Sequence, residues 1–216
     1  MSKEIKILIG IVAVVAVSFF VARQFYNKKS TDQIIAARGI TLRQEFVRED
    51  SWTLGPKDAP VTIVEFLDPE CESCKAFFPT MKSILKKHEG KVHFVVRYMA
   101  FHKSSQMAVA ATEAAGLQNK YWEMQELLFN RTEEWSHQPA PRREFFQKYA
   151  SELGLGMDRF DLDLDDPKWV EKVKRDMADG KFVGVQSTPT IFVNGVLLAD
   201  LSYEALDEAI NKVIML

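Results

Sequence analysis

The sequence predicts an α/β fold in which a helical segment is inserted between two halves of one β-sheet. Runs of apolar and β-branched residues typical of buried strands occur at 61–66 and 92–99, and strand patterns return at 190–198. Between them, residues 103–180, approximately, follow helical patterns. Because both ends of this helical block connect to strands, we expect an insertion and not an independent domain.

An N-terminal membrane anchor, or an uncleaved signal sequence, is predicted for residues 1–25. Residues 7–22 are sixteen uncharged and mostly apolar residues, with Lys6 before them and Arg23 after them. Residues 5–22, with the Lys6 ammonium extending to the interface, are just long enough for a single helix that spans a bilayer. A cleaved signal peptide is the alternative.

The globular domain is expected to span residues 51–216, after a polar linker with a short helix at residues 26–50. It begins with a short strand at 51–54, and a turn rich in Gly and Pro follows. The buried strand at 61–66 comes next and leads into a helix predicted over 71–89.

The only two cysteines of the chain, Cys71 and Cys74, open this helix. A bridge between them would close a loop too small to constrain the unfolded chain, so their reactivity explains them better than a structural disulfide does. The spacing predicts a redox dithiol. Cys71 lies where unpaired N–H groups favour a thiolate and is the expected attacking sulfur, whereas Cys74 lies one turn deeper and is the expected resolving thiol.

Further helices are predicted within the insertion, and a hairpin and a helix after it. Their ranges are 107–115, 120–129, 141–153, 157–164 and 166–180 in the insertion, 190–193 and 196–198 for strands joined by Asn194-Gly195, and 202–215 for the last helix. Gly180 is expected to close its helix as the C′ residue.

Composition argues against two classes of partner. The formal net charge is −2 and the sequence has no stripe of Lys and Arg with interleaved aromatic residues, so no nucleic acid is expected. No metal site is expected either, because structural zinc needs four ligands, whereas the four histidines are scattered and no second cysteine pair exists. Metal transport by the reduced cysteine pair is kept as an alternative function.

The residues between the cysteines are expected to tune the pair. If Glu72 and its neighbour Glu70 lie close to Cys71, they oppose formation of its thiolate and make the disulfide less oxidising. A hydrogen bond from Ser73 to sulfur would act in the opposite direction.

Four stretches form a distinctive set: GPKDAPVTIVEFLDPECESC at 55–74, the residues at 97–116 and 120–129, and GVQSTPTIFVNG at 184–195. In this order they resemble the DsbA-like family of bacterial envelope thiol oxidoreductases, which have a thioredoxin fold. The resemblance runs from about Trp52 to the C-terminus. It implies a thioredoxin-like fold with a helical insertion. The single N-terminal transmembrane helix predicted from the apolar run precedes this fold and lies outside the resemblance.

The resemblance also implies roles for particular residues. Cys71 is similar to the family's nucleophile, Cys74 to its resolving thiol, and Pro189 to its cis-proline, which faces the dithiol. Thr188 would then pair its backbone with an extended substrate segment. Glu65 matches the buried acid beneath the motif, and we expect it to have a raised pKa and to take the proton from Cys74.

The function implied is that of a membrane-anchored thiol–disulfide oxidoreductase that exchanges disulfides with protein substrates, aided by a partner redox protein. Its only cofactor would be the redox-active disulfide Cys71–Cys74. Glu72-Ser73 is not the Pro-His pair of strongly oxidising members, and Thr188 resembles members that act as isomerases or reductases. Oxidase, isomerase and reductase therefore stay open, as does a non-catalytic chaperone or binding module. The sequence leaves the oligomeric state unknown.

The location implied is the extracytoplasmic, or periplasmic, side of the cytoplasmic membrane. The distribution of positive charges favours the opposite orientation. Lys3 and Lys6 precede the apolar run, whereas Arg23, Lys28 and Lys29 follow it. Counted alone, they would place the C-terminal side in the cytoplasm. Large domains are translocated largely regardless of such charges, so the location implied by the resemblance is preferred.

Overall fold

The computed structural model describes residues 46–215. The chain divides into the units Met1–Gln44 and Glu45–Leu216, and the description concerns the second. The membrane segment predicted at 5–22 and most of the linker predicted at 26–50 lie outside the described residues. Within residues 46–215, no helix has the length and apolar character needed to cross a membrane.

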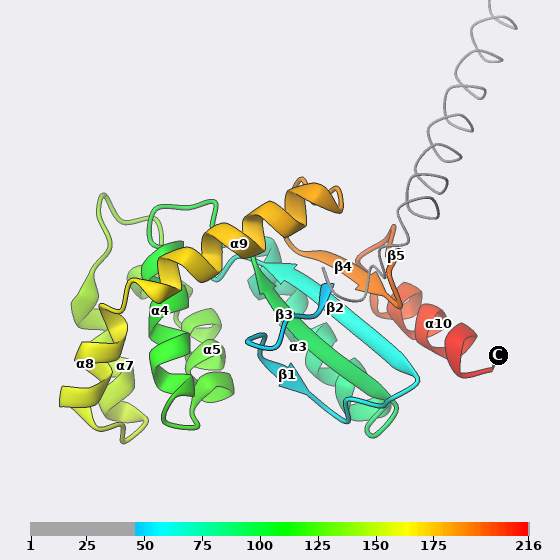
Figure 1. Ribbon diagram of the computed structural model, residues 1–216, viewed down its shortest axis with the longest axis horizontal. Helices are drawn as coiled ribbons and strands as arrows, with labels where there is room; N and C mark the ends of the chain where they lie inside the picture. Colours follow the sequence, from blue (N-terminus) through cyan, green and yellow to red (C-terminus); the bar gives the residue numbers. More distant parts are fainter. Residues whose placement is uncertain (1–45, 216) are drawn as a thin grey trace, which may run out of the picture. The chain divides into compact units, whose positions relative to one another are not determined.

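A five-stranded sheet forms the centre of the described unit (Figure 1). Its order is β1-β3-β2-β4-β5, and β2 and β3 are parallel whereas the other neighbours are antiparallel. The strands are β1 (Thr53–Leu54), β2 (Val61–Leu67), β3 (Val92–Tyr98), β4 (Thr190–Val193) and β5 (Val196–Leu197). The buried strands expected from the apolar runs at 61–66 and 92–99 are confirmed.

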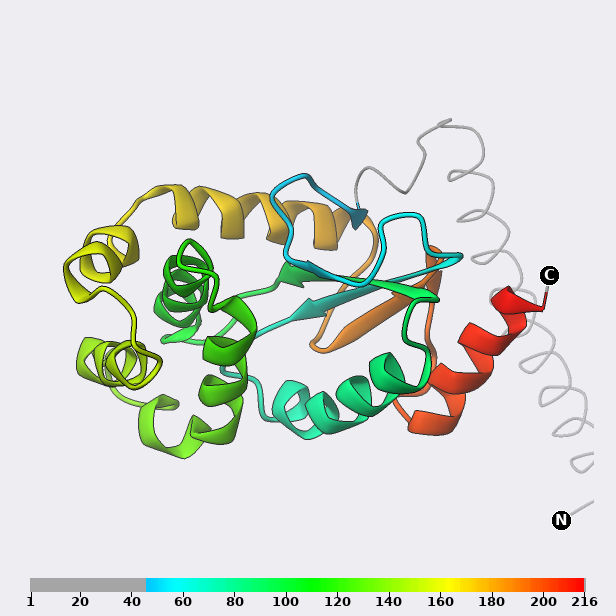
Figure 2. The same ribbon diagram turned by 90° about the horizontal axis from the view of Figure 1, so that it is seen from below.

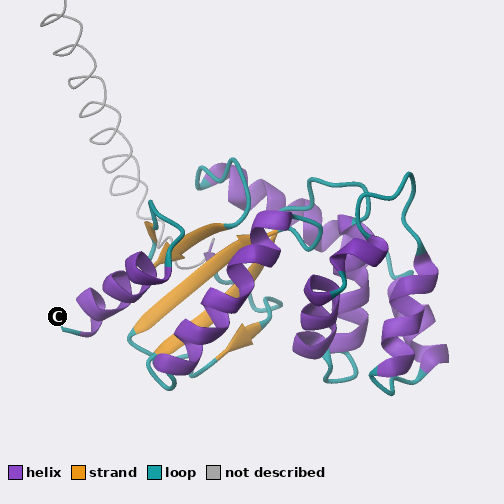
Figure 3. Ribbon diagram, turned by 180° about the vertical axis from the view of Figure 1, so that it is seen from behind, coloured by secondary structure: helices purple, strands orange, loops and turns teal. Residues whose placement is uncertain are grey.

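Helices cover both faces of this sheet. α3 (Glu72–Lys87) and α10 (Tyr203–Ile214) lie on one face, and α9 (Lys168–Phe182) crosses the other (Figure 2). Seen from behind, α3 and α10 lie in front of the strands (Figure 3). Because side chains alternate along a strand, Ile63 and Leu67 of β2 pack in the core beneath α3, whereas Phe66 faces α9.

The inserted helices gather at one end of the sheet around a core of their own (Figure 1). They are α4 (Ser105–Gly116), α5 (Tyr121–Asn130), α6 (Thr132–Trp135), α7 (Arg143–Glu152) and α8 (Met157–Leu164). Small alanines of α4 allow close packing, while Trp135 and Phe146 fill the centre. α9 then carries the chain back to the sheet.

Gly180 has a different role from the one predicted. It lies inside α9 and does not close it. A Cβ at Gly180 would lie 2.5 Å from Met99 Sδ and 3.2 Å from the Phe66 ring, so glycine allows α9 to pack closely on the sheet. The left-handed residue after α9 is Gly184, with a φ of 93°.

The folded unit begins before residue 51, where we expected its start. The ring centroid of Phe46 lies 4.6 Å from that of Phe192, and only 4% of Phe46 is exposed. Arg48 donates two hydrogen bonds to Asp179 of α9. The end of the predicted linker is therefore packed on the domain.

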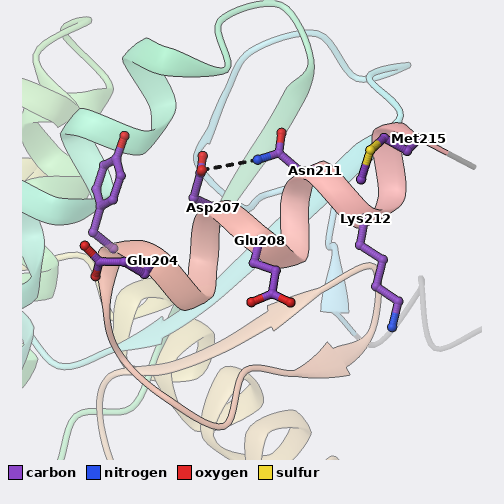
Figure 4. Close-up of a pocket in the computed structure, with 7 residues that line it drawn as sticks. Glu204, Asp207, Glu208, Asn211, Lys212 and Met215 are labelled. Atoms are coloured by element: carbon purple, nitrogen blue, oxygen red, sulfur yellow. Dashed lines mark hydrogen bonds between the residues drawn. The ribbon is translucent and has the colours of Figure 1, made fainter.

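A surface hollow runs along α10, where Asn211 Nδ2 donates to Asp207 at 3.2 Å (Figure 4). Asp207 also accepts from Lys87 Nζ at 2.8 Å and lies 2.7 Å from His88 Nε2. Ser202 caps α10, since its hydroxyl accepts from the Ala205 N–H. The contacts of Asp207 with Lys87 and His88 hold α10 against α3.

Candidate active site

Cys71 and Cys74 lie at the N-terminus of α3, and both are free thiols. Cys71 is the N-cap residue in an extended conformation, with φ −80° and ψ 123°, and it is partly exposed. Cys74 lies inside the first turn and is 1% exposed. The helix therefore presents one sulfur to solvent and keeps the other beneath it.

The surroundings of Cys71 stabilise its thiolate. A hydrogen bond with the Cys74 thiol contributes most, and the Thr188 side chain and the main-chain N–H groups of Cys74 and Ser73 contribute further. Burial acts in the opposite direction, but the pKa of Cys71 still falls to about 5. At neutral pH, Cys71 is therefore a thiolate, the form that attacks disulfides.

Cys74 has the opposite environment. Burial, the hydrogen bond with Cys71 and the nearby carboxyl of Glu65 raise the pKa of Cys74 well above its ordinary value. The Asp68 N–H donates to Cys74 Sγ at 3.5 Å. Cys74 thus stays protonated until a base removes its proton.

The peptide bond between Thr188 and Pro189 is cis and lies beside the dithiol. Cys71 Sγ is 3.4 Å from the Thr188 carbonyl oxygen. The sulfur can donate a hydrogen bond to this oxygen as a thiol but not as a thiolate. The contribution of Thr188 to the low pKa of Cys71 comes from its side chain and is smaller than that of the Cys74 thiol. Residues separated by 117 positions in the chain therefore form one surface.

Glu65 lies on β2 among the residues that face α3. It is 5% exposed, and burial alone raises its pKa to about 8. Its influence on the pKa of Cys74 shows that the two groups are electrostatically coupled. A carboxyl group that titrates near neutral pH is thus held beneath the dithiol.

Comparison with known proteins identifies the family. Residues 48–212 match the sequence model of the family described as Thioredoxin. The chain belongs to the thioredoxin family.

Within the thioredoxin family, this chain is a DsbA-like member. It is 30% identical over 168 residues to Disulfide bond formation protein D of Bacillus subtilis (strain 168), with 74% of this chain and 75% of that protein covered. The crystal structure of oxidised BdbD from Bacillus subtilis has a TM-score of 0.66 at 29% identity and covers 76% of this chain and 92% of that one. The family resemblance seen in the sequence is confirmed.

A further relative is the Na(+)/H(+) antiporter NhaA of Herminiimonas arsenicoxydans. It is 34% identical over 187 residues, which are 87% of this chain but 28% of the antiporter. This chain thus spans about a quarter of the length of the first curated relatives that it matches.

The residues expected to tune this thioredoxin-family dithiol have different surroundings. Glu70 is buried, and its carboxylate accepts from the N–H groups of Ser104 and His137, each at 2.7 Å. Glu72 points to solvent with a side chain that is 83% exposed. Ser73 acts on Cys71 through its main-chain N–H and not through its hydroxyl. Glu70 therefore joins the insertion to the active-site loop, and water screens Glu72.

Asp68 is the site residue that sequence reasoning missed. Its carboxylate is fully buried and accepts from the Ser105 hydroxyl at 2.5 Å and the Phe101 N–H at 2.8 Å. Its carbonyl oxygen accepts from the Cys71 N–H at 3.1 Å. A signal existed, because Asp68 directly follows a buried strand and precedes the cysteines, but its partners come from a loop more than thirty residues later.

His102 and His137 flank the thioredoxin-family motif from the insertion. His102 Nδ1 lies 2.7 Å from Asp68, and the two imidazole ring centroids are 6.0 Å apart. Burial lowers the pKa of His102, but the hydrogen bond to Asp68 and its charge raise it more, so the net shift is upward. Within residues 46–215, no group of three or more His, Cys, Asp or Glu side chains is arranged to hold a metal ion.

Proposed function

We propose that this protein is a membrane-anchored thiol–disulfide oxidoreductase that exchanges disulfides with protein substrates on the extracytoplasmic side of the cytoplasmic membrane. The observation that supports it most directly is the contrast between the two thiols. A partly exposed Cys71 with a pKa of about 5 lies beside a buried Cys74 whose pKa is raised. Such a pair is suited to attack by the first sulfur and resolution by the second.

In the first step, the Cys71 thiolate attacks one sulfur of a disulfide in the substrate. A bond forms between Cys71 and that sulfur, the substrate disulfide breaks, and the other substrate sulfur leaves as a thiolate. The backbone beside Pro189 is where an extended substrate segment would pair, since Thr188 lies against Cys71 Sγ.

In the second step, the Glu65 carboxylate accepts the Cys74 proton and the Cys74 sulfur attacks Cys71. The Cys71–Cys74 disulfide forms, and the second substrate sulfur leaves as a thiolate. Two electrons have then passed from the dithiol to the substrate. Oxidation of a substrate dithiol is the same sequence in reverse, with a protonated Glu65 returning its proton to Cys74.

The surroundings of Cys71 favour the oxidising direction. A low pKa of the attacking thiol stabilises the reduced protein, and this makes its disulfide a stronger oxidant. Glu72 opposes this little because it is exposed. A separate redox protein would reoxidise the dithiol after each turnover. Isomerase or reductase activity is the alternative, suggested by Thr188.

Substitution of each cysteine tests the proposal. Cys71→Ser should abolish reduction of insulin and oxidation of a dithiol peptide. Cys74→Ser should accumulate a mixed disulfide on Cys71, which mass spectrometry detects. If Cys71→Ser exchanges disulfides at the wild-type rate, the proposed chemistry is wrong. If both variants capture unfolded proteins as well as the wild type does, and the wild type itself exchanges no disulfides, the chain is a binding module.

The pH dependence of alkylation tests the electrostatic basis. Reaction of reduced Cys74→Ser with iodoacetamide reports on Cys71 alone, but it also removes the largest stabilising hydrogen bond. The wild type is therefore the better sample, because buried Cys74 reacts slowly. Its rate should be half-maximal near pH 5, and a midpoint near pH 9 would contradict the thiolate assignment.

The direction and the location need separate measurements. Equilibration with glutathione should give a reduction potential well above the value of about −270 mV typical of thioredoxin. In intact cells first treated with a reductant that does not cross the cytoplasmic membrane, a thiol reagent that is equally excluded should label Cys71 of the full chain, and the protein should sediment with membranes. Labelling only after cell lysis would contradict the extracytoplasmic location.

A further inference from the structure

Two buried carboxylates precede Cys71 in the active-site loop. Asp68 is fully buried and Glu70 is 1% exposed, and they lie three positions and one position before the attacking sulfur. Water and salt screen buried charges much less than exposed ones, so these carboxylates act more strongly on their surroundings than Glu72 does. Negative charge beside Cys71 opposes its thiolate. A loop of this kind therefore needs groups that offset its carboxylates.

The insertion supplies such groups, and they differ between the two carboxylates. Glu70 accepts hydrogen bonds from the main-chain N–H groups of Ser104 and His137, which carry no net charge. Asp68 has an imidazole beside it, because His102 Nδ1 lies 2.7 Å from its Oδ2. The Asp68 side can therefore gain or lose a full positive charge with pH, through the protonation of His102.

His102 is open to solvent and is also coupled to the dithiol. Its side chain is 39% exposed, so it can exchange its proton directly with water. The ionisable groups that act on it come from the active-site loop and from the loop after α6, and they are Asp68, Glu70, Cys71 and His137. Lys103, the next residue of its own loop, is exposed. Electrostatic coupling is reciprocal, so an imidazole that feels the Cys71 thiolate also stabilises it.

We propose that His102 is a positioning residue of the dithiol, whose imidazolium offsets the charge of Asp68 and so stabilises the reduced protein as long as His102 keeps its proton. The inference rests on the proposed function, because it gives His102 a task only in thiol–disulfide exchange. His102 acts through Asp68, which contacts both cysteines. The Asp68 carbonyl oxygen accepts from the Cys71 N–H at 3.1 Å, and its N–H donates to Cys74 Sγ at 3.5 Å.

Reduction by glutathione shows where the charge of His102 enters. Two glutathione thiols supply two electrons and become glutathione disulfide, while the Cys71–Cys74 bond breaks. Of their two protons, one goes to Cys74 and the other is released, because Cys71 remains a thiolate. The new negative charge at Cys71 favours the protonated form of His102. Loss of that proton at high pH removes this part of the stabilisation of the reduced protein.

The first test follows the histidine rings of the wild type by NMR. We expect the titration midpoint of His102 to lie about one pH unit higher in the reduced protein than in the oxidised protein, because the thiolate is present only in the reduced one. His88 is the internal control. Its Nε2 also contacts an aspartate, Asp207, at 2.7 Å, but it lies at the other end of α3. Its ring signals should titrate alike in both redox states.

His102→Asn provides the second test. The variant removes the charge and keeps a donor, since the side-chain nitrogen of Asn can occupy the place of Nδ1. The alkylation midpoint of Cys71 should move from about pH 5 to about pH 6. In equilibrium with glutathione at pH 6, the variant should favour its disulfide form about fivefold more than the wild type does. At pH 9, where His102 of the wild type is neutral, the two proteins should agree.

The dependence on pH distinguishes charge from structure. A purely structural role for His102 would give the same difference between variant and wild type at pH 6 and at pH 9, and this result would overturn the inference. The matched control is His88→Asn, which removes the other contact between a histidine and an aspartate on α3 and should behave as the wild type in both assays.

Further outcomes separate the inference from the proposed function. If His102 titrates alike in both redox states, or if His137 alone responds, the role of His102 is wrong while exchange with glutathione still supports the function. If the wild type does not equilibrate with glutathione, the function fails and the role of His102 fails with it. If His102→Asn does not fold, as judged by its thermal unfolding, the NMR midpoints of the wild type decide.

Discussion

The two faces of the central sheet both bury ionisable groups, but only one face pairs them with opposite charges. On the α9 face, Arg97 is fully buried and contacts Asp176 at 2.8 Å and Asp179 at 2.5 Å. On the α3 face, burial alone determines the pKa of Glu65, and no charged partner contributes to it. Neighbouring positions of one sheet thus hold a paired charge and an unpaired carboxyl.

The contrast shows how one scaffold separates stability from chemistry. Arg97 also donates to the Phe46 carbonyl, and Asp176 accepts from the Tyr98 N–H, so the paired charges join the start of the domain, β3 and α9. Opposite charges at hydrogen-bonding distance offset part of the cost of burying both groups. Among the residues that the structure describes, Glu65 has no such partner, so its proton remains available at neutral pH.

The largest effect is expected on the paired face. Arg97→Met should lower the free energy of unfolding by about 3–5 kcal/mol, because it leaves Asp176 buried without its counter-charge. The matched control is Arg131→Met, which removes a solvent-exposed pair with Glu152 and should lower the free energy of unfolding far less. Urea unfolding measures the free energy of unfolding of both variants. Equal losses would show that the buried ion pair contributes no more to stability than the surface pair does.

Glu65→Gln should change how stability depends on pH. The folded pKa of about 8 lies above the ordinary value of 4.5, so the contribution of Glu65 is present at low pH and is lost as pH rises through about 8. The wild type should lose on the order of 3 kcal/mol relative to Glu65→Gln between about pH 5 and about pH 8. Urea unfolding at several pH values measures the difference, and parallel curves would contradict the unpaired state of Glu65.

Dithiobis(nitrobenzoate) releases one coloured thiolate when Cys71 attacks it, and a second when Cys74 resolves the mixed disulfide. Glu65→Gln should slow the second phase of this reaction and leave the first phase nearly unchanged. The reason is that Cys74, and not Cys71, needs a base. A loss confined to the first phase would show that Glu65 acts mainly on the thiolate of Cys71.

The smallest effect is expected at Glu72, which lies next to Cys71 in the sequence. Its side chain is 83% exposed, so Glu72→Gln should move the pKa of Cys71 by less than about half a unit. The alkylation midpoint measures this. A larger shift would show that a solvated carboxylate tunes the dithiol as strongly as the buried one does.

Much of the fold and part of the site could be predicted from the sequence. The dithiol is local, because two cysteines three positions apart at a helix start lie near each other in any fold. The strand pattern around Glu65 indicated a buried position, and the resemblance placed Thr188-Pro189 beside the cysteines. The alternation of strands and helices gave the α/β class with its insertion, including the helix at 157–164 with its observed bounds.

The partners of the site residues could not be predicted in this way. Asp68 and Ser105 are joined across 37 positions, and Glu65 and Gln125 meet at one cavity from a strand and an inserted helix. No local periodicity relates such pairs. Glu70 and Glu72 illustrate the same limit, since they are two residues apart and equally acidic in the sequence, yet one is buried in hydrogen bonds and the other is solvated.

The sequence by itself therefore determined which residues form the proposed site: two cysteines, a strand acid and a turn proline on an α/β framework. Only the tertiary structure decided the pKa values of the thiols and of the carboxyl group. The pKa of a thiol or carboxyl depends on its burial and on the charges and N–H groups within a few ångströms, and packing between distant segments sets both. The chain specifies the chemistry locally, and the fold supplies the environment in which Cys71 is a thiolate and Glu65 holds a proton.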